Sequence, residues 1–199
     1  MKRFFLFNVL ILSFFSAQSQ TFPQGSMSFS AGYGVLSYGN IAVRLIENEL
    51  NYKPTSKGPF YFKGEYAVAD NFTVGLNVNT SSLSAIFNVD SVKYTGNLKF
   101  GSTSVILRAN YTLSVASDKG GIYFGVGLGY KKAKLSYYDD NPYKSLDGSI
   151  NIPLPVTFEG TVGYKYFITE NIGLYAEMGI TRSLFQIGLT SRFGTNRAN

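Results

Sequence analysis

Seven charged side chains stand in strand-like segments whose other residues on the same face are small and polar. Three of them form a predicted central cluster, Glu65, Arg108 and Glu177, and four extend it, Lys63, Glu159, Lys165 and Arg192. The three central side chains each lie about five to seven residues from a predicted turn, and therefore at similar depth. Opposite charges at one level would remove the cost of burying each charge alone. We therefore predict that these side chains form ion pairs that plug an interior space. The alternative is that each charge is separately hydrated.

Catalytic chemistry has few candidates in this sequence. The chain has no Cys and no His. Their absence removes thiolate and imidazole ligands of zinc, cysteine nucleophiles and every catalytic scheme that uses an imidazole base. No Ser-Lys pair and no pair of carboxylates stands out as a replacement. We therefore expect no enzymatic activity, no cofactor and no resident metal.

Two motifs suggest ligands but have simpler interpretations. The run from Gly125 to Gly129 has the spacing G-x-G-x-G, and no helix follows it, so glycines that relieve crowding explain it better than a phosphate loop. A loop near residues 138–153 carries Asp139, Asp140, Asn141 and Asp147, which could hold calcium. The spacing of an EF-hand is absent, which favours a solvated loop tip.

The elements that must position the charged residues are strands with two different faces. In the segment 172–181 every second residue belongs to one apolar face. These residues are Ile172, Leu174, Ala176, Met178 and Ile180. This period of two is typical of a strand between two environments. The same pattern predicts eight strands of about 9 to 11 residues, at 27–35, 60–68, 72–79, 104–113, 122–131, 156–166, 172–181 and 185–193. Short turns alternate with longer loops between them.

The content of the two faces indicates which one meets water. The polar face is mostly Gly, Ser, Thr and Asn, whereas a water-exposed surface normally carries a denser mixture of Lys and Glu. Small side chains suit a narrow lumen, and the apolar face is nearly free of charge. The sequence therefore predicts an all-β, eight-stranded antiparallel up-and-down transmembrane β-barrel. Four residues are expected to contact lipid: Leu174, Met178, Ile187 and Leu189. A soluble lipocalin-like periplasmic barrel is the alternative.

The sequence divides into a predicted signal peptide, a predicted barrel and a short polar tail. Lys2 and Arg3 precede an apolar run and then the small residues Ala17-Gln18-Ser19, which is typical of a cleaved signal peptide over residues 1–19. Residues 20–193 form the predicted barrel, and 194–199 form a short polar tail. Removal of Lys2 and Arg3 lowers the formal charge from +6 to +4, and no basic stripe indicates nucleic-acid binding.

The resemblance to a known family covers roughly residues 26–193. The repeated segments NFTVGLNV, GIYFGVGLGY and NIGLYAEMGI and the closing QIGLTSRF resemble the outer-membrane-protein β-barrel family, of the small OmpA-type size. The resemblance implies the outer membrane of a Gram-negative-type bacterium, contact with outer-membrane lipids and lipopolysaccharide, and the barrel assembly machinery as a partner. It also implies that the terminal aromatic Phe193 is part of an assembly signal. In that family this residue usually ends the chain, whereas here Gly194 to Asn199 follow it.

The expected function is a structural or small-solute role in the cell envelope. Eight strands enclose a space that side chains just fill, so passage of large solutes is not expected. The alternative is a surface-exposed binding module that recognises an unidentified external ligand through the first and third external loops, near residues 36–59 and 138–153. The sequence does not distinguish these two functions.

Overall fold

The chain folds into antiparallel strands that pair mainly with their neighbours in sequence. The computed structural model describes residues 22–38, 52–88, 95–114, 119–139, 148–152 and 155–194. These residues form β1 (Met27–Ser37), β2 (Tyr52–Ala69), β3 (Phe72–Asn88), β4 (Thr95–Ser114), β5 (Gly120–Asp139), β6 (Gly148–Ile152), β7 (Val156–Phe167), β8 (Ile172–Gly179) and β9 (Ser183–Phe193). The predicted signal peptide and the tail after Gly194 lie outside them. Within the described residues, no helix has the length and apolar character needed to cross a membrane.

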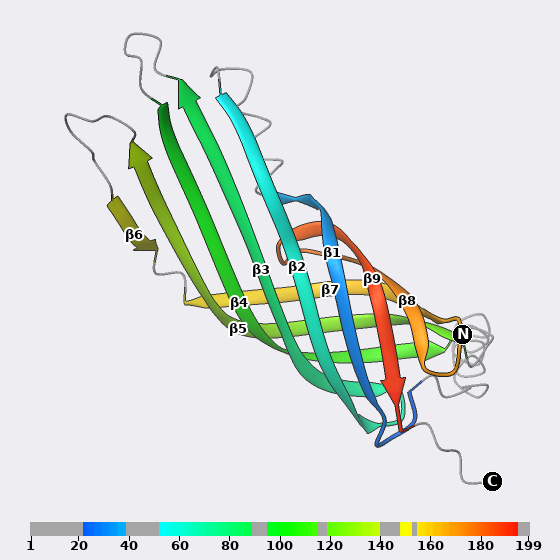
Figure 1. Cartoon of the computed structure of the whole chain (residues 1–199). Coiled ribbons are helices and arrows are strands. Elements are labelled where there is room, and N and C mark those ends of the chain that lie inside the picture. Colours follow the sequence, from blue (N-terminus) through cyan, green and yellow to red (C-terminus); the bar gives the residue numbers. More distant parts are fainter. Residues whose placement is uncertain are drawn as a thin grey trace, which may run out of the picture.

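Eight of the described strands close into a barrel (Figure 1). β1 pairs with β9 from Met27↔Phe193 to Ser37↔Ser183, which joins the first strand to the last. β5 pairs with β4 on one side and with β7 on the other. The short β6 also pairs with β5, beyond the end of β7. The predicted eight-stranded antiparallel up-and-down barrel is confirmed, and β6 is an additional strand within what was predicted to be the third loop.

Side chains of the barrel strands alternate between an exposed apolar face and a buried polar face. Leu107 and Leu189 are 65% and 61% exposed, whereas their chain neighbours Arg108 and Thr190 are 1% and 2% exposed. The other residues predicted to contact lipid are exposed as well: Leu174, Met178 and Ile187. An apolar face turned outward is the arrangement of a transmembrane barrel and the reverse of a lipocalin-like barrel.

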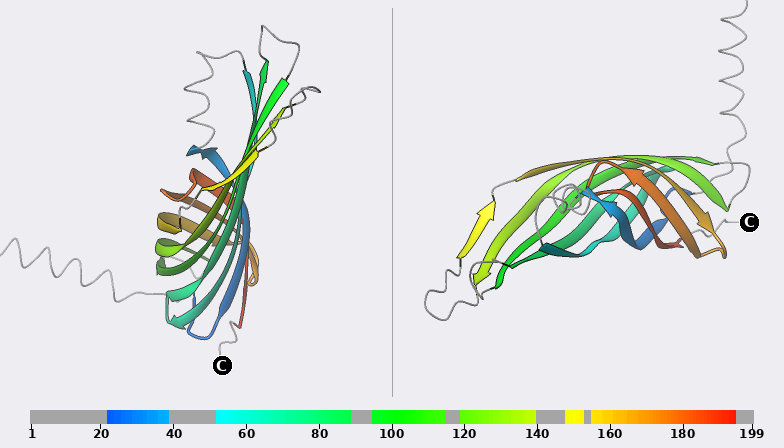
Figure 2. Two further views of the ribbon diagram at one scale, coloured as in Figure 1. Left: turned by 90° about the vertical axis from the view of Figure 1, so that its left-hand side faces the viewer. Right: turned by 90° about the horizontal axis from the view of Figure 1, so that it is seen from above.

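Four strands run well beyond the apolar band. β2, β3, β4 and β5 have 18, 17, 20 and 20 residues, more than the predicted 9 to 11. On their outward faces the apolar residues give way to Thr80, Thr103 and Lys132, which pair in one row across β3, β4 and β5. Above this row the four strands project from one side of the barrel, with β6 beside them (Figure 2). The prediction ended these strands too early because the outward residues change from apolar to polar while the backbone pairing continues.

The segment before β1 closes the opposite end of the barrel. Phe22 is 1% exposed, and its ring lies 5.8 Å from that of Phe167 in an edge-to-face contact. With Ala67 these two residues form a small apolar core. The backbone N–H of Asn71 donates to the carbonyl of Phe22, and that of Gly25 donates to the carbonyl of Ala67. Asn71, in the turn between β2 and β3, has a φ of 61°, a left-handed conformation that Asn tolerates well. The sequence analysis began the first strand at residue 27 and predicted no packing for the residues before it.

Candidate functional site

Arg108, on β4, lies at the centre of an ion-pair cluster that crosses the lumen. Its Nη2 is 3.1 Å from Oε2 of Glu177 on β8, and its Nε is 3.6 Å from Oε1 of Glu65 on β2. Its Nη1 lies 2.8 Å from Oε1 of Glu159 on β7, close enough for the charges to attract although neither atom makes an aligned hydrogen bond. One guanidinium thus links three carboxylates that come from three other strands.

Two lysines complete the charge balance of this cluster. Nζ of Lys63 is 2.8 Å from Oε2 of Glu177, and Nζ of Lys165 is 2.5 Å from Oε2 of Glu65. The Lys63 ammonium also lies over the ring of Tyr175, 4.5 Å from its centre, where a cation is attracted by the π-electrons. Three cations therefore face three carboxylates, and the lumen cluster is formally neutral. The six residues Lys63, Glu65, Arg108, Glu159, Lys165 and Glu177 are called the lumen cluster below.

Neutral side chains satisfy most of the remaining hydrogen-bonding groups of the cluster. The Tyr123 hydroxyl donates to Oε2 of Glu177 at 2.6 Å, and the Gln186 amide donates to the other oxygen of the same carboxylate. Asn77 donates to Oε2 of Glu159 at 2.5 Å, and Asn110 accepts from Nη2 of Arg108 at 2.8 Å. The sequence analysis did not single out these partners. All four belong to the inward face of their strands, which was the signal that could have found them.

Arg192 and Phe193 lie at the end of the barrel that the N-terminal segment closes. The Arg192 guanidinium stacks 4.1 Å from the centre of the Phe167 ring, and its Nε donates to the carbonyl of Glu170 at 2.8 Å. Arg192 therefore packs beside Phe167. Phe193 points outward and is half exposed, with its ring 6.2 Å from that of Phe29.

The glycines of β5 lie within the strand and make room for the lumen cluster. A Cβ added at Gly125 would lie 2.4 Å from Oδ1 of Asn110 and 2.9 Å from Nη2 of Arg108. This agrees with the expectation that the G-x-G-x-G run relieves crowding. The described residues contain no group of three or more Asp, Glu, His or Cys side chains that could hold a metal. Of the four loop residues considered as calcium ligands only Asp139 lies among them, so the expectation of a solvated loop tip falls mostly outside the described part of the chain.

We expect Gly163→Ala to destabilise the barrel by about 1 to 3 kcal/mol, a typical cost of overpacking. Gly163 on β7 pairs with Tyr123 on β5. A Cβ at this position would lie 2.3 Å from Cζ of Tyr123, so the ring, whose hydroxyl donates to Glu177, must shift. Urea titration of the protein folded in lipid vesicles would measure the change.

Gly160→Ala is the matched control for that substitution. Gly160 lies on the same strand but faces outward, and a Cβ there would lie 3.6 Å from Ile180, an ordinary contact. We expect a change within about 0.5 kcal/mol, as for other surface substitutions. Equal losses for the two variants would show that strand propensity, and not the packing of Tyr123, sets the cost.

Of the solved structures to which this chain is similar, OprG supports the fold. The outer membrane protein OprG from Pseudomonas aeruginosa matches 89% of this chain and 100% of its own, with a TM-score of 0.52 and 12% identity. Ail of Yersinia pestis, in a complex with the heparin analogue sucrose octasulfate, covers 85% of this chain and 99% of its own, with a TM-score of 0.47 and 13% identity. The N-terminal β-barrel domain of Pseudomonas aeruginosa OprF covers 85% of this chain and 98% of its own, with a TM-score of 0.43 and 16% identity. Neither a scan against protein-family models nor a search of curated proteins gave a match.

Proposed function

We propose that this protein is an integral outer-membrane β-barrel with a structural role in the envelope and a lumen closed to solutes. The outward apolar band supports residence in a bilayer, because such a surface would be unfavourable in water. The lumen cluster supports closure, because its side chains are buried and each charge is held by a partner on another strand. This charge-balanced cluster is the single observation that carries the proposal.

The proposed location is the outer membrane of a Gram-negative-type bacterium, reached through a cleaved signal peptide and the barrel assembly machinery. Outer-membrane lipids and lipopolysaccharide would then cover the exposed apolar face. We expect no catalytic activity, because the lumen carboxylates are committed to cations. Gel mobility of the membrane fraction tests the location: a folded barrel should migrate differently before and after heating. A protein that is found only in the soluble periplasmic fraction would contradict the proposal.

Planar-bilayer recordings test the closed lumen. We expect the purified protein to show no conductance steps of the size that porins produce, because the lumen cluster fills the passage. Arg108→Met should introduce small steps, since the cation that joins three carboxylates is lost. Lys99→Gln is the control: Lys99 is exposed, on the outward face of β4, and should leave the recordings unchanged. Porin-like steps in the unmodified protein would show that the lumen is open.

A second candidate is a surface-exposed binding module. The projecting part of β2 to β5 and the added β6 favour it, because these strands exceed what is needed to cross a bilayer. The predicted first and third loops fall mostly on residues 39–51 and 140–147, which lie outside the described part of the chain. Deletion of residues 139–149 separates the two functions: a structural barrel should still fold and support the envelope, whereas a receptor should lose its external ligand.

A further inference from the structure

Arg182 is a buried cation that has only neutral partners among the described residues. It lies in the turn between β8 and β9 and is 8% exposed. Its Nη1 donates to Oγ of Ser81 at 2.8 Å and to the Oγ and carbonyl of Ser102 at 2.7 and 2.9 Å, and its Nη2 donates to Oγ of Ser104 at 2.6 Å. Its Nε, also buried, has no hydrogen-bond partner there. A buried charge without a counter-ion is costly, so this position favours an anion.

Lys131 adds a second positive charge to the same place. Both side chains line a cavity of about 150 Å³ at the mouth of the barrel, together with Tyr38, Pro59 and Phe100. In the described part of the chain, none of the five ion pairs includes Arg182 or Lys131. The described part of the mouth is therefore positive, whereas the lumen cluster below it is neutral.

Apolar side chains line the wall that rises from these two cations. One row of paired residues crosses the projecting strands β3, β4, β5 and β6: Leu83, Phe100, Leu135 and Ile150. Paired residues share one face of a sheet, and this row lies two residues beyond the row of Ser81, Ser102 and Ala133. This is the inward face of the strands. It is polar below the mouth and apolar above the mouth. The outward face changes in the opposite sense, from apolar to polar.

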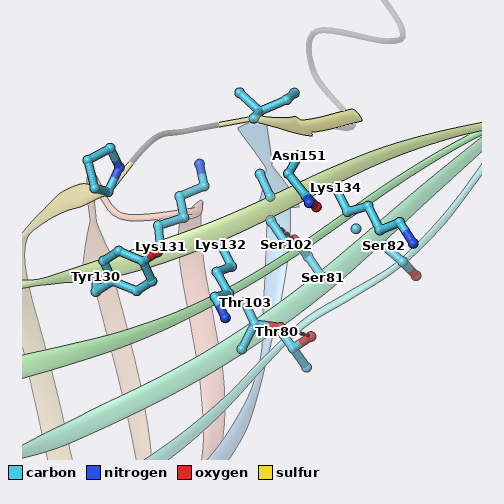
Figure 3. A pocket seen from close by; sticks show the side chains of 14 residues that line it. Thr80, Ser81, Ser82, Ser102, Thr103, Tyr130, Lys131, Lys132, Lys134 and Asn151 are labelled. Atoms are coloured by element: carbon cyan, nitrogen blue, oxygen red, sulfur yellow. Dashed lines mark hydrogen bonds between the residues drawn. The ribbon is translucent and has the colours of Figure 1, made fainter. Parts of the chain in front are cut away.

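The cavity around Arg182 continues into a larger one. This second cavity, of about 740 Å³, shares Ser81, Ser82, Ser102 and Lys131 with the first, but much of its lining, including Thr80, Thr103 and Lys132, lies on the outward face of the sheet (Figure 3). Figure 3 also shows that Lys131 and Lys132 point to opposite sides of β5, so only Lys131 faces the mouth. The small cavity itself is lined by Leu83 and Phe100 of the apolar wall, so the two cations and the wall meet in one place.

We propose that the external mouth binds a long-chain carboxylate, with the carboxylate at Arg182 and Lys131 and the alkyl chain along the wall of Leu83, Phe100 and Leu135. A guanidinium and an ammonium supply charge-assisted hydrogen bonds to the head group. The wall removes the alkyl chain from water. The proposal goes beyond the structural role and does not depend on whether the lumen conducts.

Decanoate is the probe that tests this site. The protein in phosphatidylcholine nanodiscs would be titrated calorimetrically with decanoate, with decanol and with acetate, and empty nanodiscs would supply the blank for partition into lipid. We expect saturable binding of decanoate, and weaker binding of decanol, which lacks the charge, and of acetate, which lacks the chain. Equal binding of decanoate and decanol would overturn the proposal, as would decanoate heats that match those of empty nanodiscs.

Substitutions at the mouth separate this site from general attraction of anions. Arg182→Gln and Lys131→Gln should each weaken decanoate binding by about ten-fold or more, the loss expected for one charge-assisted hydrogen bond. Lys99→Gln removes one positive charge from the outward face of the projecting sheet, beside Phe100, and should leave the affinity unchanged. Heat-dependent gel mobility would check that each variant folds. If Arg182→Gln does not fold, Lys131→Gln provides the test. Unchanged affinity in a folded mouth variant, or equal loss in Lys99→Gln, would overturn the proposal.

Discussion

Arg108→Met is expected to lower the free energy of unfolding by about 3 to 5 kcal/mol, the cost of breaking a buried ion pair by removing one partner. The substitution leaves three carboxylates with two cations. Lys63 still faces Glu177, and Lys165 still faces Glu65. Glu159, whose ion pair among the described residues is with Arg108, would keep only the hydrogen bond from Asn77. Urea titration of the folded barrel in vesicles, followed by gel mobility, measures the loss.

The double substitution Arg108→Met with Glu159→Gln tests the cause of that loss. It restores equal numbers of cations and carboxylates in the lumen cluster, since Lys63 and Lys165 then face Glu65 and Glu177. We expect it to recover a substantial part of the stability lost in Arg108→Met, although Gln at position 159 changes hydrogen bonding near Asn77. If the double variant is no more stable than the single one, packing around the Arg108 side chain, and not charge balance, sets the cost.

The alternation of side chains made the barrel and most of the lumen cluster predictable from the sequence. Which face a side chain occupies depends only on its own strand, because the period of two is a local property. The inward positions of Glu65, Arg108 and Glu177 followed from that period, and their shared depth followed from counting residues to the nearest turns. The structure brings these three together and adds Glu159 as a direct partner of Arg108.

Features that depend on pairing between distant strands were missed. The serines that surround Arg182 come from β3 and β4, about 80 to 100 residues earlier in the chain, so a turn residue with no partner in its own hairpin gave no signal. The same holds for Phe22, which packs against Phe167. The projecting ends of β2 to β5 were missed for a different reason: their outward residues are polar, as expected of a sheet above the bilayer.

The charge distribution differs between two levels of the barrel. The lumen cluster is buried and neutral, which suits a fixed plug that stabilises the barrel. The mouth carries Arg182 and Lys131 beside apolar side chains, the arrangement to which we assign a long-chain carboxylate. Burial lowers the pKa of Arg182 to about 10, which still leaves its guanidinium charged at neutral pH. A structural barrel and a binding site at its outer end are therefore compatible within one chain, because different residues serve each.

Leu107→Lys should destabilise the protein by about 2 to 4 kcal/mol, because it places a charge in the hydrocarbon region of the bilayer. Leu107 lies within the apolar band, 65% exposed, and pairs with Leu76 and Leu128 on the neighbouring strands. Thr103→Lys is the matched control: Thr103 lies four residues away on the same face of β4, in the row where the band ends, and should cost about 0 to 1 kcal/mol. Urea titration in vesicles compares the two variants. A large loss at Thr103, or equal losses at both positions, would show that the bilayer does not end at the row of Thr80, Thr103 and Lys132.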